Sequence, residues 1–435
     1  MSAANDPLST AEPDVEPGLP PTRRFRTFDA VLDVPAFRWY LLSMMANWSG
    51  MQMQNFARGY LAYQITGSFA ALGGIALANA IPRLLLALSG GVIADRASRR
   101  YVLQAGQFAS FAITAWLAAL LFAGRLTFND LLIASVLQGI AMAFTMPARQ
   151  AMIPQIVGPE RLTNAFGLNA TAMNGTRLLM PALAGVLVAV VGASWVFALM
   201  AAMFLLAFLA MFRVPKEPPA AAGAARPRGG GGRSGVGDIV EAFRYLRHQR
   251  VLATLLGVHL FVVLLTMPYQ RLLPGFVDEV LATNESESAF ILGLLLAVTG
   301  GGALIGSLVV ASLPDRRRGL LLVGSMTMFA LALLAFAWSG NVWLSVGIVL
   351  VLGFGQAGRQ SLNQILIQTH VDDAYRGRIS SIMMMEMGLE SFGTFGFALF
   401  AAAFGGAWAF TLVAVGLVVV AAVIVFFLPS YRRLE

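Results

Sequence analysis

Residues 90–100 read GGVIADRASRR, and this charged stretch separates two long apolar runs. From Asp95 onward, one acid and three arginines fall within six positions. Each flanking run has about 20 apolar residues, the length that a helix needs to cross the hydrocarbon core of a bilayer. We therefore interpret the stretch as a tight turn between two membrane-spanning helices. In the simplest interpretation it only orients the chain, because short cytoplasmic loops are rich in arginine and lysine.

The composition indicates an integral membrane protein. Of the 435 residues, 58% are hydrophobic and 12% are charged, whereas about a quarter of a soluble domain is charged. The net charge of +8 comes almost entirely from arginine in short loops, since Lys216 is the one lysine. This distribution fits orientation against anionic lipid and predicts no nucleic-acid partner. The chain has no cysteine, and its three histidines lack the spacing of metal ligands, so we expect no metal and no cofactor. It also lacks a G-x-x-x-x-G-K-[ST] motif, so we expect no ATP-driven step.

The hydropathy pattern predicts about twelve membrane-spanning helices in an all-α fold. The spans lie near 38–64, 69–94, 101–123, 129–152, 164–191, 194–213, 251–276, 289–313, 319–339, 342–368, 379–404 and 407–428. Arginines gather before span one, in every even-numbered loop and at the carboxyl end, while the opposite loops hold few besides Arg125. The positive-inside rule then places both termini in the cytoplasm, for a multi-pass protein of the cell inner membrane.

The chain divides into two halves joined by a linker. Residues 1–36 are polar and predict a disordered cytoplasmic tail, followed by a six-helix bundle at 37–213. Residues 214–250 form a cytoplasmic linker, in which 236–250 read either as an amphipathic helix on the membrane surface or as a plain linker helix. A second bundle and a short tail occupy 251–435. Arg149 and Arg359 lie at matching places in the halves, and residues 306–318 repeat the opening motif with Asp315 and Arg316.

The opening stretch fits the pattern G-x-x-x-D-R-x-x-R-R, with the five fixed positions filled by Gly91, Asp95, Arg96, Arg99 and Arg100. With the two echoing halves, it makes the chain resemble the major facilitator superfamily. The segments 63–68, 162–169 and 376–380 further resemble the branch of the enterobactin exporter and the macrolide-efflux proteins. The resemblance implies two pseudo-symmetric six-helix bundles and a conformational latch at this loop, repeated at Asp315 and Arg316. Met180 stands before Pro181 where antiporters of the superfamily often have glycine, which weakens the inference of antiport.

Ionisable side chains within the spans are where function is expected, because each costs several kcal/mol in hydrocarbon unless it is paired or hydrated. Glu386 and Glu390 are one helical turn apart on span eleven. Two interpretations stay open for them: proton coupling, or static pairing with membrane arginines. Arg83 is expected to approach Glu390 across the boundary between the halves. Arg177 is expected either to bind an anionic cargo or to pair with one of the glutamates.

Spans one and seven contain more polar residues than lipid-facing helices tolerate. Proline interrupts span seven, and interrupted helices in matching halves point to a binding site. The predicted substrate cavity comprises Asn47, Gln54, Arg58, Arg83, Arg177, His259, Tyr269 and Arg271. Hydrogen bonding between neighbouring helices is the alternative role for any one of these side chains.

These observations predict a secondary transporter that exports a small amphipathic molecule, such as a drug or a siderophore-like metabolite. Transport is expected to occur by alternating access and to be driven by protons. Its partners are then a small-molecule substrate, protons and the lipid bilayer, with the chain acting as a monomer. The alternatives are an uptake carrier, a passive facilitator or a lysolipid flippase on the same fold. A membrane-embedded enzyme or signalling protein is disfavoured, because the spans contain no nucleophile–base arrangement and no metal cluster.

Overall fold

The computed structural model describes residues 29–96, 98–216, 244–247, 249–313, 317–372, 375, 379 and 386–427, and these residues are helical or in short connections. Twelve helices of 19 to 32 residues dominate the described chain. Ten of them are long and apolar enough to cross a membrane by length and composition alone. The other two are the first long helix, which is rich in polar residues, and the eleventh, whose apolar part is Glu390–Phe404.

The long helices follow the predicted spans closely. The first six are α2 (Pro35–Thr66), α3 (Phe69–Arg96), α4 (Arg99–Phe122), α5 (Phe128–Val157), α6 (Leu162–Val191) and α7 (Ala193–Met211). The second six are α9 (Arg250–Phe276), α10 (Glu285–Ser312), α11 (Arg318–Ala337), α12 (Val342–His370), α14 (Glu386–Phe404) and α15 (Gly406–Phe427). Shorter elements are α1 (Asp29–Asp33), the 3-10 turn η1 (Pro159–Arg161) and the π-helical turn η3 (Val277–Leu281).

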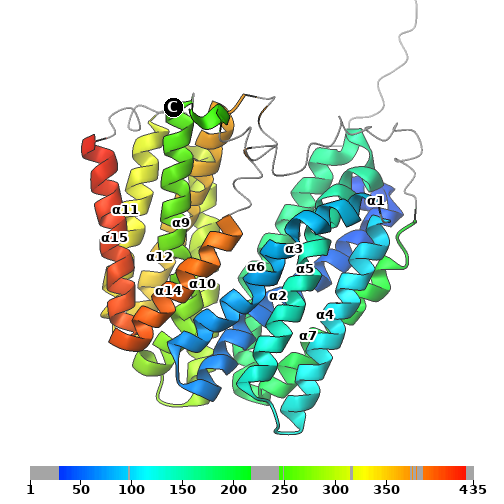
Figure 1. Ribbon diagram of the computed structural model, residues 1–435, viewed down its shortest axis with the longest axis horizontal. Coiled ribbons are helices and arrows are strands. Elements are labelled where there is room, and N and C mark those ends of the chain that lie inside the picture. The colour runs from blue at the N-terminus through cyan, green and yellow to red at the C-terminus, as the bar shows by residue number, and fades with distance from the viewer. Residues whose placement is uncertain are drawn as a thin grey trace, which may run out of the picture.

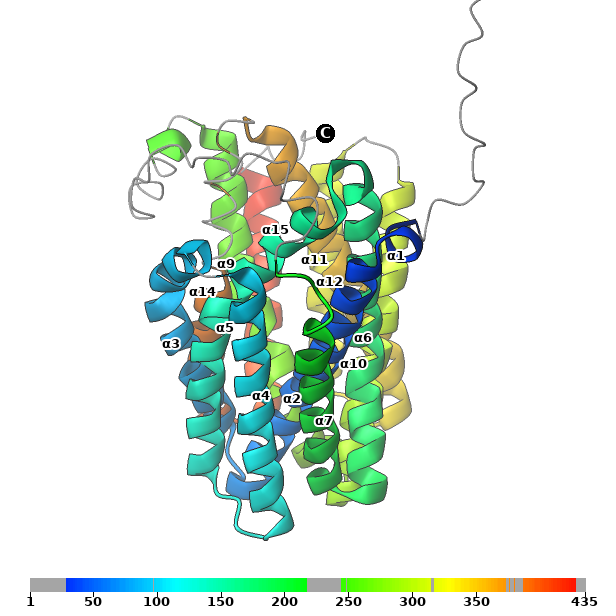
Figure 2. The same cartoon turned by 90° about the vertical axis from the view of Figure 1, so that its right-hand side faces the viewer.

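The helices form two bundles that stand side by side (Figures 1 and 2). In the first bundle, α4 and α2 pack on α7, and α3 packs on α5; in the second, α10 and α11 pack on α12, and α11 packs on α15. The bundles meet along two helix pairs, α3 with α14 and α6 with α10. These pairs are equivalent under exchange of the halves, since each joins the second helix of one bundle to the fifth of the other.

The two ends of the bundles differ. One end, here called the short-loop end, has the brief connections after α2, α4, α6, α9, α11 and α14. The other, the linker end, has the start of α2, the ends of α7 and α15, and the start of α9. Apart from isolated contacts, the described parts of α5 and α12 pack only on helices of their own bundle.

Local sequence ends the helices where the two bundles come together. Gly67 adopts φ 60°, a left-handed conformation that glycine reaches without steric cost, and its N–H donates to Tyr63 O at 2.7 Å. Asn284 caps α10 by accepting a hydrogen bond from the Glu287 N–H at 2.9 Å. Both features fix side chains of α2 and of the α9–α10 connection at the short-loop end.

Glycines allow the bundles to approach closely at the α6–α10 contact. A Cβ added at Gly185 would lie 2.6 Å from Ala289 O and 2.7 Å from Gly293 Cα, and one added at Gly293 would lie 2.9 Å from Gly185 Cα. On the α3–α14 contact, a Cβ at Gly73 would lie 2.7 Å from Ala398 Cβ. The atoms closest to a Cβ at Gly185 belong to the backbone, so the steric clash could be relieved only if α6 and α10 moved apart.

We expect Gly185→Ala to weaken the contact between the bundles by about 1–3 kcal/mol, the typical cost of overpacking. Thermal unfolding of the purified protein measures the effect as a lower melting temperature. Gly175→Ala is the matched control on the same helix, because nothing lies within 4 Å of a Cβ at that position. Equal melting temperatures for the two variants would contradict this account.

Candidate functional site

Three ionisable side chains from both bundles gather at mid-depth. Arg271 Nη2 on α9 lies 3.4 Å from Glu390 Oε1 on α14. Arg83 on α3, in the other bundle, lies within electrostatic range of both Glu390 and Arg271. The glutamate is thus shared between an arginine of its own half and one across the boundary. The sequence predicts an approach of Arg83 to Glu390, and the structure also places Arg271 beside this glutamate.

Arg177 occupies the equivalent depth on the other bundle boundary. Its side chain is exposed on α6, and it acts electrostatically on Tyr269, a fully buried residue of α9. Among the described residues, Arg177 forms no ion pair with a glutamate, which was one of its two predicted roles. Arg83, Arg177 and Arg271 therefore place three positive charges at the boundary of the bundles, against the carboxylate of Glu390.

The polar residues of α2 point into the first bundle. Asn47 Oδ1 accepts a hydrogen bond from Arg149 Nη2 at 2.8 Å, and Gln54 Nε2 donates to Thr114 Oγ1 at 3.4 Å. Asn47, Gln54 and Arg58 are all buried. Asn47 and Gln54 were predicted to line the substrate cavity, but in this conformation they contact helices of their own bundle. Gln52 and Asn55, which bond each other at 3.3 Å, are the more exposed polar pair of α2.

A buried chain of hydrogen bonds extends this network across α4 and α5. Gln107 Nε2 donates to Ser43 Oγ at 2.8 Å, and Gln138 Nε2 donates to Ser110 Oγ at 3.0 Å. These side chains surround a narrow cavity of about 10 Å³, which is room for about one water molecule. Interhelical bonds of this kind are typical of membrane bundles, in which polar side chains have no lipid partner.

The second bundle has a corresponding buried group. His259 of α9 lines a small cavity together with Arg359 and Asn363 of α12. Arg359 Nη2 donates to Thr266 Oγ1 at 3.4 Å. This places His259 and Arg359 at the same helices, by pseudo-symmetry, as Asn47 and Arg149 in the first bundle. His259 and Tyr269 are buried inside their bundle, as the cavity residues of α2 are.

Hydrogen bonds join the bundles at the short-loop end. Tyr63 Oη donates to Glu279 Oε1 at 2.8 Å, and Gln64 Nε2 donates to Asp278 Oδ1 at 2.7 Å. Tyr60 Oη donates to the backbone oxygen of Glu285 at 2.9 Å. The three donors occupy one face of the last turns of α2, and two of the acceptors are charged, which strengthens the bonds. We call this set the α2–α9 gate.

Sequence reasoning did not assign the α2–α9 gate, although its components were visible. The loop after span seven is acidic, and Tyr63 and Gln64 belong to the segment at 63–68 that resembles the exporter branch. The sequence could not show that these residues meet in space, because the acids follow the tyrosine by more than 200 positions in the chain.

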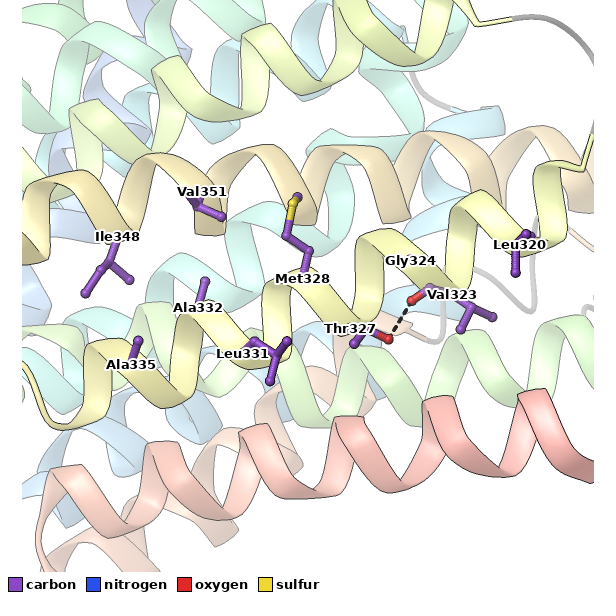
Figure 3. A pocket seen from close by; sticks show the side chains of 10 residues that line it. All are labelled: Leu320, Val323, Gly324, Thr327, Met328, Leu331, Ala332, Ala335, Ile348 and Val351. Carbon is purple, nitrogen blue, oxygen red and sulfur yellow. Dashed lines mark hydrogen bonds between the residues drawn. The ribbon is translucent and has the colours of Figure 1, made fainter.

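A large apolar groove lies away from these charges. It has a volume of about 730 Å³ and is lined by residues of α11 and α12 (Figure 3). Its one hydroxyl, on Thr327, donates to Val323 O of the same helix at 2.9 Å (Figure 3). Because α11 packs on α12 and α15 at the outer side of the second bundle, the groove faces away from the first bundle (Figure 1). It offers no polar group to orient a cargo.

The predicted latch is described only in part. The side chains of Gly91, Asp95 and Arg96, and residues Asp315 and Arg316 altogether, lie outside the described residues, as does the side chain of Glu386. Arg100 Nη2 donates to Phe212 O at 3.2 Å, and its guanidinium lies 6.0 Å from the centroid of the Phe212 ring. Arg100 therefore holds the end of α7 within the first bundle. The predicted helix at 236–250 also lies mostly outside the described residues, which include helical positions 244–247.

Contacts of Tyr245 fix the end of the linker on the second bundle. The rings of Tyr245 and Tyr375 stack at a centroid distance of 4.0 Å, and Tyr245 Oη donates to Asp372 Oδ2 at 2.9 Å. Desolvation raises the pKa of Tyr245 above its ordinary value, and the interactions with the Asp372 carboxylate raise it further, although the hydrogen bond from the Asp372 backbone acts in the opposite direction. The phenol therefore stays protonated, and able to donate this bond, throughout the neutral pH range.

Two helical bundles of six membrane-length helices, with scarce ionisable residues collected at their boundary, define a membrane transporter of the two-bundle class. Residues 40–394 match the sequence family described as Major Facilitator Superfamily, and the chain belongs to that family.

Curated relatives include exporters. The chain is 27% identical over 365 residues to "Staphyloferrin A transporter" of Staphylococcus aureus, covering 82% of this chain and 87% of that protein. It is 31% identical over 300 residues to "Enterobactin exporter EntS" of Citrobacter koseri, covering 67% of each. It is 27% identical over 358 residues to "Multidrug efflux pump Tap" of Mycobacterium tuberculosis, covering 80% of this chain and 82% of the pump.

The fold is also that of solved transporters. A bacterial homologue of the human lysosomal transporter Spinster, described as inward-facing and unoccupied, aligns with a TM-score of 0.71 at 16% identity. The alignment covers 92% of this chain and 98% of that one. At this identity the likeness establishes the fold alone.

We expect loss of the α2–α9 gate to shift the protein toward a state that is open at the short-loop end. The double variant Tyr63→Phe with Gln64→Leu removes both bonds to carboxylates while keeping the side-chain volume. Spin labels on Ile65→Cys and Val280→Cys, one exposed residue in each bundle, should report a longer distance. The chain has no native cysteine to interfere with labelling.

Thr66→Val is the matched control for this experiment. Its hydroxyl donates to Ala62 O within α2 at 2.6 Å and makes no bond across the boundary. A label distance that widens equally in the control and in the double variant would show that the α2–α9 gate does not hold the bundles together.

Proposed function

We propose that the chain exports a small amphipathic molecule, a drug or a siderophore-like metabolite, across the bacterial inner membrane by alternating access with proton coupling. The single observation that supports this most is the mid-depth cluster, in which Glu390 is held between Arg271 and Arg83 at the boundary of the bundles. A carboxylate at a moving boundary can change its partner, and with it its protonation, during the transport cycle.

The direction of transport is proposed from the relatives and from the arginines. The names of the relatives describe an enterobactin exporter and a multidrug efflux pump. Arginines concentrate in the loops of the linker end, which favours that end as cytoplasmic. With this orientation, the bonded α2–α9 gate closes the outer side, and the conformation is the inward-facing one that would load cargo from the cytoplasm.

The nature of the cargo is proposed from the charge at the boundary. Arg83, Arg177 and Arg271 outnumber Glu390 and Glu386 together, so the boundary favours a molecule with at least one acidic group. Apolar residues make up most of the surrounding helices, which suits an amphipathic body beside that group. An arginine that releases Glu390 to bind such a cargo would leave the glutamate free to take a proton.

The function is tested by transport into inverted membrane vesicles that contain the protein. Export predicts that an imposed proton gradient drives accumulation of cargo inside these vesicles, whereas a passive facilitator only equilibrates it. A deletion strain screened for antibiotic hypersensitivity and for loss of secreted metabolites identifies the cargo to use. Accumulation only in right-side-out vesicles would establish uptake and overturn the proposal.

We expect Glu390→Gln to abolish proton-driven accumulation while leaving exchange of cargo for cargo, because an amide keeps the shape of the carboxyl group but does not titrate. Glu386→Gln is tested in parallel as the second candidate. Glu160→Gln is the control, because this glutamate is exposed at the linker end. A Glu390→Gln protein that keeps full accumulation and an unchanged pH profile would exclude Glu390 from coupling.

A further inference from the structure

Arg58 is a buried cation for which the described chain supplies no partner. The residue is 6% exposed, and its Nε and Nη2 have no hydrogen-bond partner. Among the described residues, no carboxylate forms an ion pair with it. Arg149, which is partly buried, donates to Asn47, so it differs from Arg58 in this respect. An isolated charge at membrane depth is strongly unfavourable.

The geometry of the two unbonded nitrogen atoms indicates which kind of ligand would fit Arg58. The Nε–H and one Nη2–H of a guanidinium point the same way from one edge, and this edge matches the two oxygens of a carboxylate. A monatomic anion would satisfy the charge but would use the two parallel donors less well. The free edge of Arg58 is therefore shaped for a planar, bidentate acceptor.

Arg58 lies on α2 between Gln54 and the residues of the α2–α9 gate. Gln54, one turn away on α2, contacts Thr114 of α4, which gives the interior near Arg58 a polar wall. Tyr63 of the gate follows Arg58 by five residues, about 7–8 Å along a helix axis. A ligand held at Arg58 would thus bind beside α2, about one and a half helical turns before Tyr63.

We propose that Arg58 anchors a carboxylate-binding site, and that the transported molecules are carboxylic acids. The second half of this statement rests on the proposed transport function, and the first half does not. In the unliganded protein the described residues offer the cation no partner, and in the liganded protein the bidentate contact replaces its lost hydration. Binding beside the α2–α9 gate positions the acid for release through the short-loop end.

The binding is tested on the purified, full-length protein by thermal unfolding with hippurate, an amphipathic carboxylate. Hippuramide, its neutral amide, and chloride at equal ionic strength are the ligand controls. We expect hippurate alone to raise the melting temperature of the wild-type protein. The hippurate concentration for half the shift should increase at least tenfold in Arg58→Met and less in Arg58→Lys, which keeps the charge without the two-donor edge.

The thermal stability of the unliganded variants gives a second, independent test of the Arg58 site. Arg58→Met should raise the melting temperature without ligand, because it removes an uncompensated charge. Arg149→Met should lower it, because it removes a satisfied hydrogen bond, and should keep the hippurate response. A rise with chloride equal to that with hippurate, or a hippurate response unaltered by Arg58→Met, would overturn the site.

Uptake of labelled hippurate into the inverted vesicles separates the two halves of the proposal. Carboxylate cargo predicts saturable, proton-driven accumulation that Arg58→Lys impairs. An intact thermal shift without hippurate accumulation, in vesicles that still accumulate the cargo found by the deletion screen, would overturn the substrate class and leave the transport function standing. Loss of all proton-driven accumulation with an intact thermal shift would instead overturn the transport function.

Discussion

The cost of placing a polar or charged group in hydrocarbon governs the whole structure. Lipid offers no hydrogen bond, so each polar side chain at membrane depth turns toward other helices or toward the boundary between the bundles. Asn47 meets Arg149, Gln138 meets Ser110, and Arg271 meets Glu390. The apolar groove on α11 and α12 obeys the same constraint, because its single hydroxyl donates a hydrogen bond to the backbone of its own helix.

The same constraint explains how two rigid bundles can remain loosely joined. Each bundle keeps its own buried polar network, so relative movement of the bundles leaves those bonds intact. The described contacts that cross the boundary are of three kinds, one of which is the electrostatic approach of Arg83 to Glu390. Glycines bring α6 onto α10 by van der Waals contact, and a few bonds of the α2–α9 gate close one end. Such contacts can exchange for equivalent ones at low cost, as alternating access requires.

Much of the candidate site could be predicted, but its geometry could not. The sequence pointed to Arg83, Arg177, Arg271 and Glu390 because ionisable residues in apolar spans are rare. It did not reveal that Arg271 competes with Arg83 for the glutamate, which depends on how α9 and α14 pack within one bundle. Asn47 and Gln54 were expected in the cavity between the bundles and lie inside one of them. Polar residues occur on more than one face of α2, so its rotation could not be deduced.

The sequence by itself determined the number and length of the helices, their division into two halves and the family, because these depend on hydropathy, periodicity and short motifs. The tertiary structure alone decided which polar side chains meet, how Tyr63 and Gln64 reach acids more than 200 residues later, and that Arg58 finds no partner among the residues that the structure describes. The physical reason is that hydropathy is a property of each residue and its near neighbours. Pairing depends on helix rotation and on contacts between distant segments, which a local pattern does not specify.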